Sequence, residues 1–121
     1  MTVKIYEYQR CSTCQKALRF LEERKVLYTR LPIVEKPPTR SELKKMLSWV
    51  KVNGGNLKKL FNTSGEVYRE MGLSQKLGKM SEDDALSLLE KNGKLVKRPF
   101  VLMEKQGLVG FKEEEWEKVF G

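Results

Sequence analysis

The two cysteines of this chain lie three residues apart, in Cys11-Ser12-Thr13-Cys14, where an apolar strand gives way to an amphipathic helix. Amide N–H groups and the positive dipole end at the start of a helix stabilise an anion beside the first turn. A cysteine at that position holds more of its reactive thiolate form. The pattern therefore predicts an α/β fold in which this junction carries a redox or oxyanion-handling thiol site.

The two thiols are expected to have different roles. Cys11 lies at or just before the helix N-terminus, with Arg10 adding positive charge, and is the predicted nucleophile. Cys14 follows one helical turn later on the same face, where it can attack a mixed disulfide on Cys11 and release the reduced product. We expect Cys14 to be the more buried and less acidic thiol. The alternative is that both cysteines are ordinary small hydrophobic residues.

Composition narrows the chemistry further. The chain has no histidine, which excludes Ser-His-Asp triads, Cys-His pairs and histidine-ligated metals, and two cysteines are too few for a structural zinc site. No metal is therefore expected. The net charge of +8 favours anionic partners, although lysines and glutamates are interspersed as on solvated helix faces. No nucleic-acid-binding motif is present.

The length of the chain fits a single domain over residues 1–121. No apolar run is long enough to cross a membrane, and the start of the chain, Met1–Tyr6, lacks the apolar core of a signal peptide. We expect a monomer in the cytoplasm without membrane attachment.

Hydrophobic periodicity predicts the order of strands and helices. Residues 3–8 alternate like a strand, a helical period starts at Ser12, and residues 26–34 return to extended character. These elements predict a parallel, right-handed β-α-β unit. The next fifty residues or so, about 39–92, are expected to be all-helical, with Thr39 as an N-cap.

The last part of the chain is predicted to be β-β-α. Strands at 100–103 and 108–111 flank Lys105-Gln106-Gly107, a hairpin with glycine in its turn, and a helix covers 113–120. All strands together predict a four-stranded mixed sheet. The core residues expected on the two longer helices of the insert are Leu43, Met46, Leu47 and Val50, and Ala85, Leu88 and Leu89.

Two further segments contain candidate site residues. At Arg98-Pro99 the peptide bond is a candidate for cis, and Arg98 either points at the thiolate to bind an anion or is a surface arginine before an edge strand. Asn62-Thr63-Ser64-Gly65 either supplies polar groups to a ligand or caps the following helix, with capping favoured. The residues expected to contact the substrate or its anionic group are Arg10, Ser12, Thr13, Asn62 and Pro99.

The chain resembles the arsenate reductase (ArsC)/Spx family from Val3 to about Phe120. The motifs that carry the resemblance are Cys11-Ser-Thr-Cys14, Pro-Pro-Thr-Arg-Ser-Glu-Leu at 37–43, Phe-Asn-Thr-Ser-Gly at 61–65, Tyr68-Arg-Glu-Met-Gly-Leu73, Lys97-Arg98-Pro99 and Val109-Gly110-Phe111. The resemblance implies a thioredoxin-like fold with a helical insert, a cis Pro99 beside the thiol and Arg98 in the site.

Within this family, glutaredoxin-coupled arsenate reductases carry one essential cysteine and three arginines around the bound oxyanion. By position the cysteine falls on Cys11 and one arginine on Arg98. The other two arginines fall near Asn62 and Phe111, which carry no positive charge. The resemblance therefore implies a site like that of an arsenate reductase with two of its three cationic contacts missing, and with a second cysteine that those reductases usually lack.

Three functions are compatible with this resemblance. The first is a thiol–disulfide oxidoreductase that acts on a small disulfide or an oxyanion, holds no bound cofactor and takes electrons from glutathione, glutaredoxin or thioredoxin. The second is an Spx-like transcriptional regulator, which senses disulfide stress through a Cys11–Cys14 disulfide and binds the C-terminal domain of the RNA polymerase α-subunit. The third is a family member that binds anions without turnover. An enzyme is the first expectation.

Overall fold

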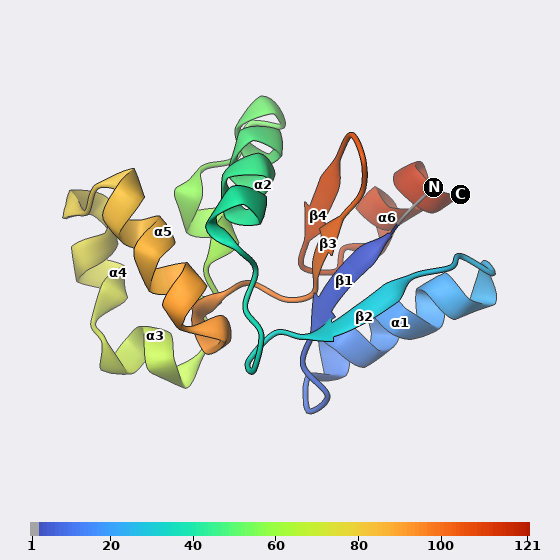
Figure 1. Ribbon diagram of the computed structural model, residues 1–121, viewed down its shortest axis with the longest axis horizontal. Coiled ribbons are helices and arrows are strands. Elements are labelled where there is room, and N and C mark those ends of the chain that lie inside the picture. Colours follow the sequence, from blue (N-terminus) through green and yellow to red (C-terminus); the bar gives the residue numbers. More distant parts are fainter. Residues whose placement is uncertain (1–2) are drawn as a thin grey trace.

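The computed structural model describes residues 3–121. Met1 and Thr2 lie outside the described residues; they are the first residues of the predicted domain and of the segment predicted not to be a signal peptide. A four-stranded sheet in the order β2-β1-β3-β4 forms the centre of one lobe (Figure 1). Its strands are β1 (Lys4–Glu7), β2 (Thr29–Pro32), β3 (Phe100–Leu102) and β4 (Gly107–Val109). β1 and β2 are parallel and the other two pairs are antiparallel, which confirms the mixed, thioredoxin-like sheet.

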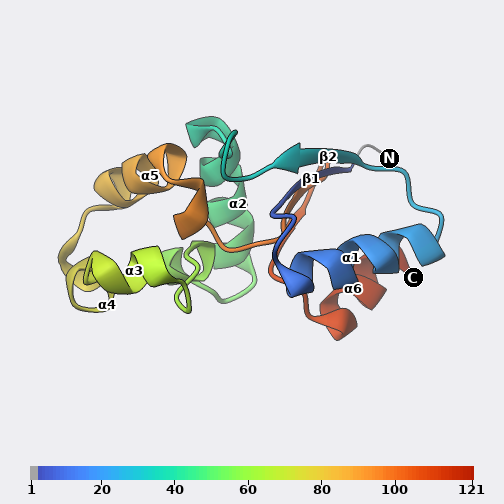
Figure 2. The ribbon, with the colours of Figure 1, turned by 90° about the horizontal axis from the view of Figure 1, so that it is seen from below.

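Two amphipathic helices, α1 (Ser12–Glu23) and α6 (Glu113–Phe120), cover one face of this sheet (Figure 2). The residues buried between these helices and the sheet are Val3, Ile5, Ala17, Leu18, Phe20, Leu21, Val101, Met103 and Trp116. Burial of this face holds α1 against β1, and the short loop between them fixes where α1 begins.

The helical insert lies beyond the other face of the sheet and forms a second lobe (Figures 1 and 2). Its helices are α2 (Arg40–Val52), α3 (Glu66–Glu70), α4 (Leu73–Lys76) and α5 (Glu82–Lys91), with 3-10 turns at Leu57–Leu60, Leu77–Lys79 and Gly93–Leu95. The all-helical insert is confirmed. Its buried side chains share one core with residues of the sheet such as Tyr6 and Phe100.

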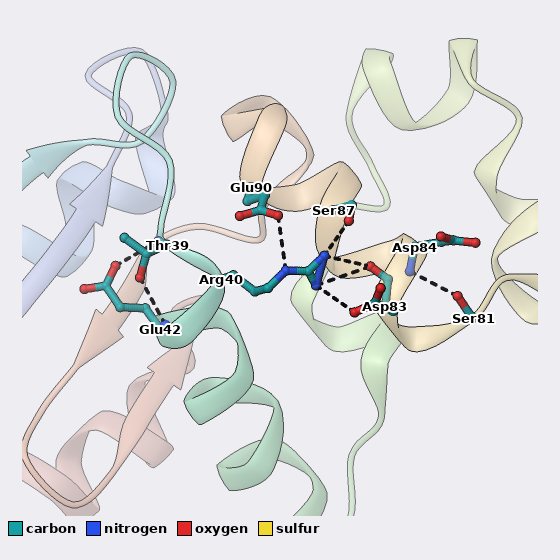
Figure 3. Close-up of polar contacts among 8 residues, drawn as sticks. All are labelled: Thr39, Arg40, Glu42, Ser81, Asp83, Asp84, Ser87 and Glu90. Atoms are coloured by element: carbon teal, nitrogen blue, oxygen red, sulfur yellow. Dashed lines mark hydrogen bonds and ion pairs between the residues drawn. The ribbon is translucent and has the colours of Figure 1, made fainter.

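The start of α2 follows the prediction. The Glu42 N–H donates to Thr39 Oγ1 (3.2 Å) and the Thr39 N–H donates to the Glu42 carboxylate (3.0 Å), so the two residues form a capping box (Figure 3). The four residues predicted to form the core face of α2, Leu43, Met46, Leu47 and Val50, are all buried.

The predicted position of Gly107 is wrong. Gly107 is the first residue of β4, and the turn lies before it, closed by a hydrogen bond from the Met103 N–H to the Gln106 carbonyl (2.9 Å). A Cβ on Gly107 would lie 2.7 Å from Met46 Cε and 2.8 Å from Trp49 Cε3. Glycine is required here because α2 packs closely over β4, not because the turn needs it.

The predicted core face of α5 is confirmed but lacks one residue. Ala85 and Leu89 are buried, Leu88 is half-buried against the same core, and Leu86, which was not predicted, is buried as well. The buried face of α5 is therefore wider than a single stripe, and α5 packs with it against α2 and the rest of this core. Within residues 3–121, no helix has the length and apolar character needed to cross a bilayer.

Candidate active site

Cys11 is the N-cap residue of α1. Its backbone is extended (φ −93°, ψ 115°), and its N–H donates to the Tyr8 carbonyl oxygen (3.0 Å), which closes the turn between β1 and α1. The Cys14 N–H donates to the Cys11 sulfur across 3.4 Å. The predicted position of Cys11 is confirmed: its sulfur takes the place that a side-chain oxygen occupies in most N-caps.

Opposing effects set the pKa of Cys11. Partial burial disfavours the thiolate and raises the pKa, but hydrogen bonds from the Cys14 backbone and side chain, together with the charge and hydrogen bonding of Arg98, outweigh it. The pKa of Cys11 therefore lies below that of an ordinary cysteine. A larger share of Cys11 is thiolate at neutral pH than would be so for a free thiol.

Cys14 lies one helical turn further on and is fully buried. Burial raises the pKa of Cys14 to about 12, against a hydrogen bond with the Tyr8 backbone and with further increases from Cys11 and Glu7. It is the more buried and less acidic thiol, as predicted. The expected Cys11–Cys14 disulfide is not formed: both cysteines are free, and the hydrogen bond between the two residues runs from the Cys14 N–H to the Cys11 sulfur.

A buried carboxylate beside these thiols, that of Glu7, was not predicted. Glu7 is the last residue of β1 and is 7% exposed. Arg30 Nε lies 3.8 Å from one carboxylate oxygen, whereas Oε2 is buried and has no hydrogen-bond partner among residues 3–121. Burial raises the pKa of Glu7, opposed by the charge of Arg30. Strand alternation is the signal that could have identified it, because Val3, Ile5 and Glu7 share one face of the strand.

Arg98 contacts the loop that carries Cys11. The Arg98–Pro99 bond is cis, as expected, and the guanidinium carbon lies 4.7 Å from the centroid of the Tyr8 ring. Arg98 Nη1 is buried and, within the described part of the chain, makes no hydrogen bond. The charge of Arg98 lowers the pKa of Cys11, and the role of Arg98 in binding an anion stays a prediction.

Three other candidate residues do not meet at Arg98. Arg10 and Ser12 are exposed on the surface. Thr13 lines a cavity of about 540 Å³ that also contains Phe111 and four lysines. The anion-binding roles assigned to these three residues stay predictions.

Asn62, in contrast, lies in the same cavity as Arg98, which measures about 410 Å³. The loop does supply the N-cap of α3, which is Gly65, but no side chain of the loop forms a capping hydrogen bond. Two cations of this cavity, Arg69 and Lys94, were not predicted. Nothing in their local sequence distinguishes them from other exposed basic residues, and only the fold brings them to Arg98.

Known proteins similar to this chain support the family and the fold. The ArsC family model matches residues 6–119. The uncharacterized protein YusI of Bacillus subtilis is 43% identical over 118 residues, which cover 98% of both chains. The global transcriptional regulator Spx of Streptococcus mutans is 29% identical over 105 residues, which cover 87% of this chain and 73% of the regulator.

Solved structures similar to this chain have the same fold. The crystal structure of an ArsC family related protein from Bacteroides fragilis has a TM-score of 0.88 and 50% identity, with 98% of each chain covered. A protein from Streptococcus mutans described as a possible arsenate reductase has a TM-score of 0.82 and 36% identity, with 95% of this chain and 97% of that chain covered.

Proposed function

The chain belongs to the ArsC family, and we propose that within this family it is a cytoplasmic thiol–disulfide oxidoreductase with Cys11 as nucleophile and Cys14 as resolving thiol. The observation that carries the proposal is the position of the Cys11 sulfur. It caps α1, accepts the Cys14 N–H and lies beside Arg98, while a second thiol is one turn away.

The proposed reaction has two exchange steps. The Cys11 thiolate attacks one sulfur of the substrate disulfide, a mixed disulfide forms, and the other half of the substrate leaves as a thiolate. Cys14 then attacks the Cys11 sulfur, releases the second half and passes its proton to the departing thiolate. The substrate is reduced by two electrons, and the two cysteines are oxidised to a disulfide.

A thiol reductant completes the cycle. We propose glutathione, glutaredoxin or thioredoxin, each of which can reduce the Cys11–Cys14 disulfide by the same exchange chemistry and needs no cofactor bound to this chain. An oxyanion such as arsenate is the alternative substrate. It is supported by the similarity to the Streptococcus mutans protein described above and opposed by the uncharged side chains of Asn62 and Phe111.

Replacing each cysteine tests the proposal. We expect Cys11→Ser to abolish turnover of bis(2-hydroxyethyl) disulfide, because serine is not ionised at neutral pH. Cys14→Ser should keep the first step and accumulate a mixed disulfide on Cys11, visible by mass spectrometry. Alkylation of Cys11 as a function of pH should give a pKa below that of a free cysteine. Undiminished turnover by Cys11→Ser would contradict the proposal.

The second candidate function is a redox-sensing regulator that binds the C-terminal domain of the RNA polymerase α-subunit. The observation that favours it is the match to Spx regulators over most of the chain. A pull-down with that domain, using the reduced and the oxidised protein, separates the two functions. If neither form binds, this candidate is excluded.

A further inference from the structure

The cavity beside Arg98 is positively charged and is lined by Tyr8, from the loop that carries Cys11, and we call it the basic cavity. It has a volume of about 410 Å³ and combines three cations with polar side chains. The residues used below are Tyr8, Asn62, Ser64, Arg69, Lys94 and Arg98. Glu66 is the one acidic residue that lines it, so the cations outnumber the carboxylates by three to one.

The three cations come from separate parts of the chain. Arg69 belongs to α3, Lys94 to the turn Gly93–Leu95, and Arg98 to the segment before β3. None of them forms an ion pair in the part of the chain that the structure describes. Their charges therefore act together on whatever enters the basic cavity.

Arg98 connects this cavity to the reactive sulfur. Its guanidinium lies over the Tyr8 ring, and the Tyr8 carbonyl accepts the Cys11 N–H. Its Nη1 is buried and lacks a hydrogen-bond partner among residues 3–121. A buried cationic donor without a partner is unfavourable, and a planar carboxylate or a phosphate satisfies a guanidinium with two parallel hydrogen bonds.

We propose that the basic cavity binds a carboxylate or phosphate group of the disulfide substrate, so that the protein prefers anionic disulfides. This inference rests on the proposed oxidoreductase function. Arg98 holds the anionic group next to Cys11, and Asn62 and Ser64 offer hydrogen bonds to it. The positive charges of Arg69 and Lys94 attract an anionic substrate and have little effect on a neutral one. The basic cavity determines which disulfides bind well, and the two exchange steps at Cys11 and Cys14 are the same for every disulfide.

A matched pair of substrates tests the preference. 3,3′-Dithiodipropionate and its diamide have the same chain and the same disulfide, and differ in charge. We expect a higher kcat/KM for the dianion. Arg69→Gln and Lys94→Gln should each lower the ratio of the two kcat/KM values about threefold, and the double variant about tenfold. Lys45→Gln, which removes the same charge from an exposed position on α2, is the control and should leave the ratio unchanged.

The outcomes separate this inference from the function on which it rests. If the protein reduces both disulfides and the double variant keeps the ratio of the wild type, the basic cavity does not select anions and the inference is overturned. If neither disulfide is reduced, the proposed function fails instead. Binding is then measured by NMR titration of Cys11→Ser with dithiodipropionate and with the diamide. Equal affinity for the two compounds would overturn the inference without any turnover.

Discussion

The thiol end of the molecule and the helical insert use their charged side chains in opposite ways. In the insert, Arg40 on α2 contacts Asp83 (3.0 Å), Glu90 (3.3 Å) and Ser87 on α5, so one guanidinium joins two helices (Figure 3). At the thiol end, Glu7 Oε2 and Arg98 Nη1 are buried without a partner among residues 3–121. In the insert, the charged side chains stabilise the fold. At the thiol end, the unpartnered atoms of Glu7 and Arg98 stay available for a proton or a ligand.

An unpartnered atom alone does not mark a functional site. Tyr68 Oη on α3 is also buried and unpartnered within the described residues, and it has no effect on the thiols. Glu7 and Arg98 differ because Arg98 lowers the pKa of Cys11 and Glu7 raises that of Cys14. Substitutions in the insert should therefore change stability and leave the thiol pKa unaltered, whereas substitutions at the thiol end should change the thiol pKa.

The largest effect is expected at Gly93, where the insert returns to the sheet. A Cβ on Gly93 would overlap the Ile33 carbonyl group, lying 2.7 Å from its carbon, and both residues are fully or nearly buried. We expect Gly93→Ala to lower the free energy of unfolding by about 3 kcal/mol, measured by urea denaturation. Gly78→Ala, at a position where a Cβ meets no atom within 4 Å, is the control and should be near neutral. If the pKa of Cys11 changes in folded Gly93→Ala, the expectation that substitutions in the insert leave the thiol pKa unaltered is wrong.

Arg98→Gln tests the thiol end. Loss of the positive charge should raise the pKa of Cys11, measured by alkylation as a function of pH, and lower turnover about tenfold. The free energy of unfolding should change by no more than about 1 kcal/mol, because Nη1 forms no hydrogen bond with the described residues and the contact with the Tyr8 ring is the interaction that is lost. Arg10→Gln, which removes an exposed cation next to Cys11, is the control with a smaller effect on the pKa. A strongly destabilised Arg98→Gln would show that the residue is structural.

Arg40→Gln tests the insert with a smaller change. We expect a loss of about 1 kcal/mol in the free energy of unfolding, because Arg40 is 29% exposed and contacts three side chains at once. Lys51→Gln breaks the other ion pair between α2 and α5, Lys51–Glu82, in which both side chains are about half exposed. This control should cost less than about 0.5 kcal/mol. Equal losses in the two variants would mean that the Arg40 contacts do not act as a network.

Local sequence patterns predicted the elements of both regions. The capping box at Thr39 and the apolar spacing of α2 are local signals, and the N-cap position of Cys11 follows from the change of period between β1 and α1. The errors arise where distant segments meet. Gly107 is required by α2, which lies far from it in the sequence, and Arg69 and Lys94 reach Arg98 only through the fold. Glu7 is different, because its strand position implied burial although carboxylates are seldom buried.

The smallest effects concern the pH dependence of stability, and they compare two carboxylates, Glu7 at the thiol end and Glu42 at the start of α2. Burial raises the pKa of Glu7, so between the ordinary glutamate pKa and the raised folded value the folded protein binds more protons than the unfolded chain. The free energy of unfolding therefore falls as pH rises through this interval. For Glu42, burial works against ionisation, but the Lys4 ammonium, the Thr39 N–H and the Tyr6 hydroxyl outweigh it and lower the pKa. Its stabilising contribution is present above the ordinary pKa and is lost as pH falls.

Glu7→Gln and Glu42→Gln should therefore shift the stability profile in opposite directions. Urea denaturation between about pH 3 and pH 7, a range that extends below the ordinary glutamate pKa, should show that Glu7→Gln removes a decrease in stability with rising pH. Glu42→Gln should remove an increase, together with contacts of 2.6 Å to Lys4 and 2.7 Å to Tyr6. The slope against pH is the measure, because a buried amide at position 7 changes the absolute stability by itself. Slopes that change in the same direction in both variants would show that the Glu7 carboxylate has a partner in solution, and the contrast between the two regions would then rest on Arg98 alone.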